Sequence, residues 1–301
     1  METRKITIFE APSNLGLMPP APGKEPGVKC LSQALLAAGL GARLGAATAG
    51  KIPPPPYSPR IDRRAGVRNA EAIRRYTFDL AAALEDALRH GQFPLVLGGD
   101  CSILLGCMLA SRRLGHFGLM FLDGHTDFGT PETSLTGGAA GMDLALACGY
   151  GPQGLTSYEG LTPLVAEKDV VVFGHRDISD PAAYIWQEVF DTDILLIDLD
   201  AIRTIGLDKA VAQALDRLES RRLDGFWIHL DADVLDEAVM PAVDSPQPGG
   251  FSYPELAGVL AALLASDLAV GLDITIFDPT LDPDGSVAAA FVEALASGFG
   301  A

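Results

Sequence analysis

Seven short runs of apolar residues recur along this chain of 301 residues, and longer segments separate them. Each run is almost continuously apolar, which is the pattern of a strand that is buried on both faces of a parallel sheet. The longer segments leave room for the helical crossovers that parallel strands require. The sequence therefore predicts an α/β protein with three layers, αβα, around a parallel central sheet. The runs cover residues 6–9, 93–97, 117–122, 170–173, 194–197, 226–230 and 269–274.

The clearest helix is predicted over residues 70–90. Asn69 is suited to cap its N-terminus, and Gly91 is suited to end it. Apolar side chains at helical spacing should form its buried stripe, and they are Ile73, Phe78, Leu80, Leu84 and Leu88. Further helices are expected after Asp208, Tyr253 and Ser286.

Two segments interrupt this alternation. Residues 45–68 contain four consecutive prolines at 53–56, which can continue neither a helix nor a central strand. This segment could be an interdomain linker, but no change of composition follows it, so we interpret it as a surface excursion of one domain that covers residues 1–301. Residues 129–141 form a loop rich in Thr, Ser and Gly, and loops in such a position shape the access of substrate.

Composition excludes several classes of partner. The formal net charge is −17 and no stripe of Lys and Arg is present, which argues against binding to nucleic acid. No segment reaches the roughly 20 apolar residues of a membrane span. The four cysteines lack CxxC spacing, and a chain of this size needs no disulfide framework. We therefore expect a soluble cytoplasmic protein.

Acidic residues follow two of the predicted strands with a spacing of two. Asp123, His125 and Asp127 alternate after one strand, and an extended backbone turns alternate side chains to the same face. Asp231 and Asp233 repeat this spacing after another strand, although such a pair alone could belong to a turn or a helix cap. Four carboxylates at one edge of a sheet repel one another unless cations neutralise them, which predicts two metal ions.

A third cluster is the sequence GGDCS at 98–102, where a strand passes through a glycine turn into a helix. Asp100 or Ser102 could simply cap that helix. Cys101 could be a small buried apolar residue, or its position at a helix N-terminus could lower its pKa and make it a thiolate ligand.

The ordered set GGD-x-S, D-x-H-x-D, D-x-D followed by VLD, and GLDI-x-x-x-DP closely resembles the arginase/agmatinase/formimidoylglutamase family, the ureohydrolases. The match extends from residues 14–16 to 281–283. The resemblance implies an arginase-like fold, a homo-oligomer and a small-molecule substrate. It also implies a binuclear manganese centre whose hydroxide attacks the carbon of a guanidinium or similar C–N group. The implied ligands are Cys101, Asp123, His125, Asp127, Asp231 and Asp233.

The expected chemistry agrees with these residue types. Two hard cations held by carboxylate and imidazole lower the pKa of a bridging water, so hydroxide is available at neutral pH. Asp127, which would contact both metal and hydroxide, is the expected carrier of the proton to the leaving nitrogen.

Three positions depart from the family pattern. Cys101 replaces a histidine, and its softer thiolate should alter the metal preference at that ion toward Zn²⁺ or Fe²⁺. Because carboxylates still dominate the site, two Mn²⁺ ions remain the expectation, with Zn²⁺, Fe²⁺ or Ni²⁺ as alternatives. A branch of the family that acts on Nω-hydroxyarginine looks similar here. Ala140 stands where the family has a loop histidine that assists proton transfer. Ile276 stands where the family has a glutamate that pairs with the guanidinium, and losing one partner of a buried ion pair costs about 3–5 kcal/mol. Ordinary arginine is therefore not the expected substrate.

Other residues are candidates for contacting the substrate. Glu132 and Asp244 could supply a replacement counter-charge or could be ordinary loop residues, and Thr136 lies in the same loop as Glu132. Residues 174–180 resemble the family segment that holds the amino-acid end of the substrate. His175 and His229 fall outside the ligand pattern, so we interpret both as structural. The candidates within residues 174–180 are Asp177, Ser179 and Asp180.

The main hypothesis is a binuclear-metal hydrolase of a linear guanidino, amidino or formimidoyl compound. The three departures also allow a second class, a non-catalytic or regulatory relative that binds metal or ligand without turnover. A zinc deacylase on a related fold would accommodate Cys101, but not the complete D-x-H-x-D and D-x-D pair.

Overall fold

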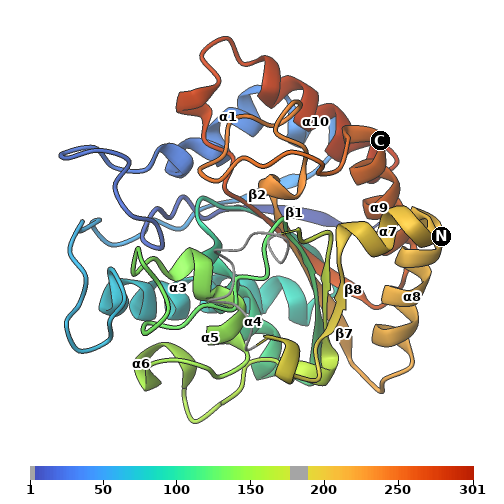
Figure 1. The fold of residues 1–301 in the computed structure, drawn as a ribbon. Helices are drawn as coiled ribbons and strands as arrows, with labels where there is room; N and C mark the ends of the chain where they lie inside the picture. Colours follow the sequence, from blue (N-terminus) through green and yellow to red (C-terminus); the bar gives the residue numbers. More distant parts are fainter. Residues whose placement is uncertain (1–3, 177–188) are drawn as a thin grey trace.

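The computed structural model describes residues 4–176 and 189–301 of the protein. Within these residues, eight strands form one sheet in the order β2-β1-β3-β8-β7-β4-β5-β6, and every neighbouring pair is parallel (Figure 1). All seven predicted strands are present. The strands are β1 (Ile6–Glu10), β2 (Ala47–Lys51), β3 (Phe93–Leu97), β4 (Phe117–Leu122), β5 (Val170–Phe173), β6 (Leu195–Ile197), β7 (Gly225–Asp231) and β8 (Ala269–Thr275).

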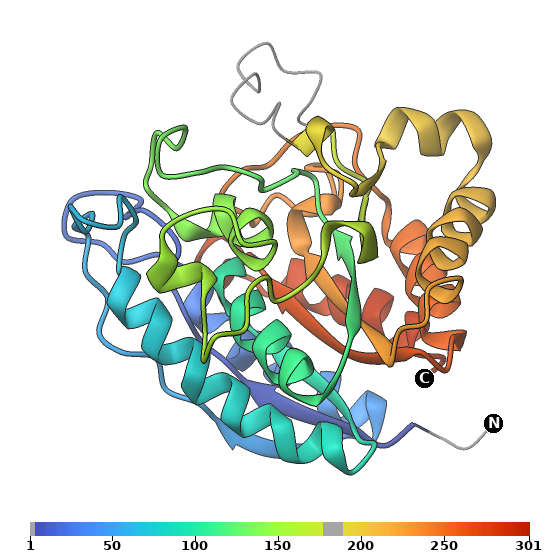
Figure 2. The ribbon, with the colours of Figure 1, turned by 90° about the horizontal axis from the view of Figure 1, so that it is seen from below.

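Helices cover both faces of this sheet (Figures 1 and 2). One face carries α3 (Ala70–Arg89), α4 (Leu104–Leu114), α5 (Asp143–Ala147) and α6 (Gln153–Thr156). The other face carries α1 (Leu31–Ala37), α2 (Leu40–Leu44), α7 (Leu199–Ile205), α8 (Leu207–Glu219), α9 (Tyr253–Ala265) and α10 (Ser286–Gly298). The predicted three-layer α/β fold is thereby confirmed.

The continuous apolar runs are explained by two separate cores. In β4, Met120 and Leu122 pack into the core under α8, α9 and α10, whereas Leu119 and Phe121 pack into the core under α3 and α4. Because successive side chains of a strand point to opposite faces, a strand with helices on both sides must be apolar at every position.

Two local expectations need correction. Residues 45–68 are not entirely a surface excursion, because they begin with the edge strand β2, which pairs with β1. Its sequence ATAGK is small and largely exposed, so it lacks the apolar signal that marks the other strands. Asn69 stands at the N-cap of α3, directly before Ala70, but its side chain forms no capping hydrogen bond. Its side chain instead accepts a hydrogen bond from Ser58 N (2.7 Å) and donates one to Leu15 O (2.8 Å).

The four central strands of the sheet are β3, β8, β7 and β4, and two of the neighbouring pairs, β3–β8 and β7–β4, join strands that are far apart in the sequence. Parallel strands end at the same edge of a sheet, so the segments that follow these four strands meet there. These strand ends and the segments after them carry the four sequence motifs, the last of which begins inside β8. Among the described helices, none combines the length and the apolar character that crossing a lipid bilayer requires.

Candidate metal centre

Metal-ligating side chains gather at the carboxyl edge of the four central strands in two groups. Asp123, His125 and Asp233 form the first group, and Cys101, His229 and Asp231 form the second. Within each group, the potential ligand atoms all lie within 4.8 Å of one another. The structure therefore brings together five of the six ligands expected from the sequence, and it adds His229.

The first group joins the end of β4 to the end of β7. His125 Nδ1 lies 2.9 Å from Asp233 Oδ2 and 3.7 Å from Asp123 Oδ1. Gly124 N donates to Asp233 Oδ1 (3.1 Å), which orients that carboxylate. A Cβ atom at Gly124 would lie 2.6 Å from the Arg176 guanidinium and 2.8 Å from Asp233 O, so only glycine permits this approach.

The second group joins the turn after β3 to the end of β7. Cys101 Sγ donates to Asp231 Oδ2 (2.8 Å) and to Thr275 Oγ1 (3.3 Å). Asp231 Oδ1 accepts from Asp233 N (2.7 Å), so one carboxylate links the two groups. The shared strand β7 therefore sets the separation between the groups.

The turn that presents Cys101 is held in place from the loop after β1. A Cβ atom at Gly99 would lie 1.8 Å from Ser13 O, so this close approach requires glycine. Asp100 accepts hydrogen bonds from Ser102 N (3.0 Å) and from Ser13 Oγ (2.5 Å). Asp100 is therefore the cap of this turn, as one of the two interpretations of the sequence proposed.

Burial and mutual repulsion oppose ionisation at this site. Burial raises the pKa of Asp123 well above its usual value, and the charges of Asp127 and Asp233 raise it further. Burial and then Asp233 act in the same way on the pKa of Asp231. Asp233 differs, because His125 and Arg176 outweigh the effect of burial and lower its pKa. A divalent cation would compensate the charge that these carboxylates carry when ionised.

The expectation that Cys101 has a lowered pKa is wrong for the protein groups alone. Burial raises the pKa of the Cys101 thiol well above its usual value, and Asp231 and Asp143 raise it further. The turn Cys101–Ile103 runs directly into α4, and the field at this helix N-terminus does not offset burial and those neighbours. Thiolate at this position requires a cation next to it.

The donors available here fit divalent metal ions. Carboxylate, imidazole and thiolate are the side chains that bind such ions. Three donor atoms of this region, Asp123 Oδ2, Asp143 Oδ2 and His229 Nε2, are buried and have no hydrogen-bond partner among the described residues. Buried polar atoms normally have a partner, so atoms of this kind in one cluster indicate ligand positions.

Asp127 belongs to neither group, although it lies at the same strand end and is only 9% exposed. Its charge contributes to the raised pKa values of both Asp123 and Asp231, so the carboxylate acts on both groups. Its φ of 41° is in the left-handed region, which Asp and Asn tolerate better than most residues. The backbone therefore bends sharply at Asp127.

A pocket of about 300 Å³ opens onto both groups. Thr136, Asp244 and Ile276 line it together with His125, Asp231 and Asp233. Ala140 also lines it. A wider cavity of about 980 Å³ shares Leu17, Met18, Thr136, Asp244 and Ser245 with this pocket, so the two form one route to the site.

The remaining substrate candidates are not brought to this pocket. Glu132 is exposed and lines neither cavity. Asp177, Ser179 and Asp180 lie outside the described residues. Ile276 is 2% exposed and has a φ of 70°, which is strained for a β-branched residue. Its N–H donates to Gly99 O (2.7 Å), which fixes it beside the turn of Cys101.

Three buried polar residues near the ligand groups were not among the ligands expected from the sequence, and they are His229, Asp273 and Asp143. His229 and Asp273 lie inside strands that are otherwise apolar, and Asp143 begins α5. A polar residue within a fully buried strand needs a partner, and this was the signal that could have identified the first two. The interpretation of His229 as structural rested only on its place outside the D-x-D spacing.

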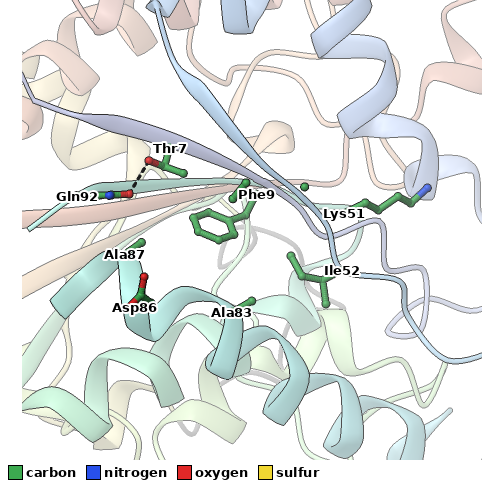
Figure 3. Close-up of a pocket in the computed structure, with 10 residues that line it drawn as sticks. Thr7, Phe9, Lys51, Ile52, Ala83, Asp86, Ala87 and Gln92 are labelled. Atoms are coloured by element: carbon green, nitrogen blue, oxygen red, sulfur yellow. Dashed lines mark hydrogen bonds between the residues drawn. The ribbon is translucent and has the colours of Figure 1, made fainter. Parts of the chain in front are cut away.

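Another pocket, of about 420 Å³, lies at the β2 edge of the sheet (Figure 3). Thr7, Phe9 and Lys51 line it, and Thr7 Oγ1 donates to Gln92 Oε1 (2.8 Å). None of its lining residues belongs to the two ligand groups. This pocket is therefore separate from the candidate metal centre.

Comparison with known proteins identifies relatives over the whole chain. The sequence profile of the Arginase family matches residues 5–299. An arginase of Brevibacillus brevis is 33% identical over 73% of this chain and 73% of that protein. The structure of the arginase of Bacillus caldovelox superposes with a TM-score of 0.88 at 28% identity, covering 99% of both chains. The agmatine ureohydrolase of Thermoplasma volcanium shares the fold alone, with a TM-score of 0.68 at 20% identity over 99% of this chain and 89% of that one.

Proposed function

The chain belongs to the arginase family and is a hydrolase of carbon–nitrogen bonds in linear amidines, and we propose that it acts on a small guanidino, amidino or formimidoyl compound other than plain arginine. The observation that carries this proposal is the convergence of two buried ligand groups at the ends of β4, β7 and the turn after β3. The restriction on substrate rests on Ile276 and Ala140, which both line the pocket.

Two divalent ions are part of the proposal. Asp123, His125 and Asp233 would hold one ion, and Cys101 and Asp231 would hold the other, with Asp127 next to both groups. When bound, the ions would supply Lewis acidity that lowers the pKa of water and stabilises negative charge on its oxygen. Mn²⁺ suits the carboxylates and imidazole of the first group, and the thiol of the second group favours Zn²⁺, Fe²⁺ or Ni²⁺.

The protein groups around the ions position the substrate and move the proton. Asp127, whose charge acts on both groups, carries the proton to the leaving nitrogen, because Ala140 in the pocket lining offers no titratable group. Arg176 donates to the carbonyl oxygens of Asp233 (2.8 Å) and Leu235 (3.2 Å), which fixes the segment that follows β7. Arg176 thereby positions Asp233 through backbone carbonyl groups, in addition to the side-chain contacts within the first group.

Asp244 is the residue that we propose as the counter-charge for a cationic substrate. The pKa of Asp244 is raised to about 6, first because its carboxyl group lies among protein atoms and second because Asp233 is near. The residue as a whole is solvent-exposed, and it lines both the pocket and the wider cavity. At neutral pH most of this group is ionised. Ile276, in contrast, presents no charge.

The test combines metal analysis with a panel of substrates. Urea, ammonia and formamide would be measured over guanidino, amidino and formimidoyl compounds, with Mn²⁺, Zn²⁺, Fe²⁺ and Ni²⁺ compared. We expect turnover of at least one compound and weak or no turnover of arginine. Fewer than one divalent ion per chain after purification with excess Mn²⁺ would rule out the proposal.

A second candidate function is a regulatory relative that binds metal and ligand without turnover. The absence of both an acidic side chain at 276 and an imidazole at 140 favours it. This candidate predicts that panel compounds raise the melting temperature of the metal-loaded protein while no product is released. Release of any product that Asp127→Asn abolishes would exclude it.

We further propose that residues 1–301 act as one catalytic unit in a homo-oligomer of the cytoplasm. All four cysteines are free in the structure, which suits a reducing compartment. Size-exclusion chromatography with light scattering would measure the oligomeric state. A strictly monomeric protein would contradict this part of the proposal.

A further inference from the structure

The imidazole of His229 is held from two sides by neighbouring strands. His229 is fully buried in β7, opposite Phe121 of β4 and Asp273 of β8. Its ring stacks on Phe121, with 4.6 Å between centroids and 19° between planes. Nδ1 lies 2.6 Å from Asp273 Oδ2, and the other carboxylate oxygen accepts from Trp227 Nε1 (2.5 Å). The plane and the direction of the ring are therefore fixed.

These contacts decide which nitrogen is available as a ligand. A carboxylate only accepts, so in the neutral imidazole the proton is on Nδ1 and the lone pair is on Nε2. Nε2 is buried and has no hydrogen-bond partner within the described part of the chain. Metal-binding histidines show this arrangement, in which the second nitrogen donates to a carboxylate and the first faces the ion.

The available nitrogen lies next to the position where the chain departs from its family. A ring nitrogen of His229, Cys101 Sγ and a carboxylate oxygen of Asp231 lie within 4.8 Å of one another. Asp143 Oδ2, which is buried and also lacks a partner, lies 3.9 Å from His229 Nε2. A metal ion between Asp143 Oδ2 and His229 Nε2 could lie at a usual bond length of about 2.0–2.2 Å from both atoms.

We propose that His229 is a ligand of the ion held by Cys101 and Asp231, and that strand β7 thereby supplies the imidazole that the turn at residue 101 has lost. This inference rests on the proposed two-ion function. Asp273 is a positioning residue, because it acts on the ion only through the ring of His229. Thiolate, imidazole and carboxylate together favour Zn²⁺ or Fe²⁺, so this site should select a different metal from the Asp123 group.

The first test counts ions and follows the thiolate. Wild type, His229→Ala, Asp273→Asn and the control His90→Ala would be loaded with Mn²⁺, Zn²⁺ or Co²⁺ and analysed for bound metal. His90 is a suitable control because its imidazole is exposed at the end of α3. With Co²⁺, the sulfur-to-metal charge-transfer absorption reports the ion on Cys101 alone. Circular dichroism would check that each variant is folded.

We expect two ions per chain in wild type and His90→Ala, and one in His229→Ala, with the charge-transfer band weakened or lost. Asp273→Asn should keep the charge-transfer band but weaken metal affinity at the Cys101 site by roughly 10–100-fold. Substitution of a residue that hydrogen-bonds to a metal-binding histidine typically has an effect of this size. If His229→Ala does not fold, Asp273→Asn still decides, because unchanged affinity in that variant would overturn the proposal. A folded His229→Ala with two ions at wild-type affinity would overturn it as well.

The second test moves the imidazole back to residue 101. The double variant Cys101→His/His229→Ala should regain the second ion while lacking the charge-transfer band. A histidine with only a structural role would not respond to a substitution at residue 101, so failure to regain the ion counts against the proposal. The experiment distinguishes failure of the proposed function from failure of the proposed role of His229. Wild type without bound ions contradicts the proposed function itself, whereas wild type with two ions and an unaffected His229→Ala contradicts only the role of His229.

Discussion

Cys101 Sγ lies 2.8 Å from Asp231 Oδ2, although 130 positions separate these residues in the chain. The contact exists because β8 lies between β3 and β7, so that the turn after β3 reaches across the end of β8 to the end of β7. Thr275, the last residue of β8, accepts a hydrogen bond from the same sulfur (3.3 Å). The candidate metal centre therefore depends on the order of strands in the sheet.

Removing metal should destabilise the protein. The buried carboxylates of Asp123 and Asp231 lose their compensating charge when ions leave, and a ligand at a hundredfold excess over its Kd contributes about 2.7 kcal/mol. We expect EDTA to lower the melting temperature by roughly 5–10 °C and added Mn²⁺ to restore it. Thermal unfolding followed by circular dichroism measures this shift. Equal melting temperatures with and without chelator would contradict it.

Asp127→Asn should abolish catalysis while the fold persists. Asn tolerates the left-handed backbone at this position (φ 41°), but it cannot carry the proton to the leaving nitrogen. We expect kcat to fall by a factor of about 10²–10⁴. The control Asp127→Ala should lose roughly 1–2 kcal/mol of unfolding free energy in addition, because Ala is strained at this φ. An Asn variant with more than a tenth of wild-type kcat would disprove the proton-carrier role.

Ile276→Glu should raise activity toward arginine. The side chain lines the pocket beside both ligand groups, and a carboxylate there would pair with a guanidinium. A buried pair of about 3–5 kcal/mol corresponds to a gain in kcat/KM on the order of hundreds-fold or more. Ile276→Gln has the same shape without the charge and should show no gain. Equal values of kcat/KM toward arginine for the two variants would show that charge at residue 276 does not determine the substrate.

Glu255→Ala should destabilise α9 in a pH-dependent way. Burial raises the pKa of Glu255, but bonds from Arg203 and Ser252 outweigh it and lower the pKa below its usual 4.5. A lowered folded-state pKa means that the stabilisation is present above pH 4.5 and is lost as the pH falls through the lowered value. We expect a loss of about 1 kcal/mol at pH 7 from the capping box with Ser252.

Urea unfolding of wild type and Glu255→Ala at pH 7, pH 5 and pH 4 measures this difference. The difference should stay nearly constant between pH 7 and pH 5 and begin to shrink at pH 4. Lys209→Ala on α8 is a suitable control, because it changes an exposed charge without removing a cap. A difference that grows as the pH falls would contradict the assigned sign.

The fold was predictable because its signals are local. Each central strand is apolar along most of its length, as β4 shows with Leu119 and Met120 in opposite cores, and that pattern identifies a parallel sheet without knowledge of its order. The edge strand β2 was missed for the same reason. It is exposed and is held by pairing with β1, so its residues carry no apolar pattern.

The candidate site was predictable only in part. Asp123, His125, Asp231 and Asp233 follow from a spacing of two after a strand, which holds wherever the strand is placed. Glu132 and Asp244 looked equivalent in the sequence, yet only Asp244 lines the pocket. Asp273 seemed to identify the family and nothing more, whereas its side chain lies 2.6 Å from His229.

The sequence by itself determined the fold class, the family and the side chains that each strand presents at its end, because these depend on neighbours along the chain. The tertiary structure decided which strand ends are adjacent, and with it the second ligand group. Cys101, His229 and Asp231 come together only because β3, β8 and β7 lie side by side. Strand order is set by the packing of helices over both faces of the sheet. The spacing of residues within a single motif does not predict that order.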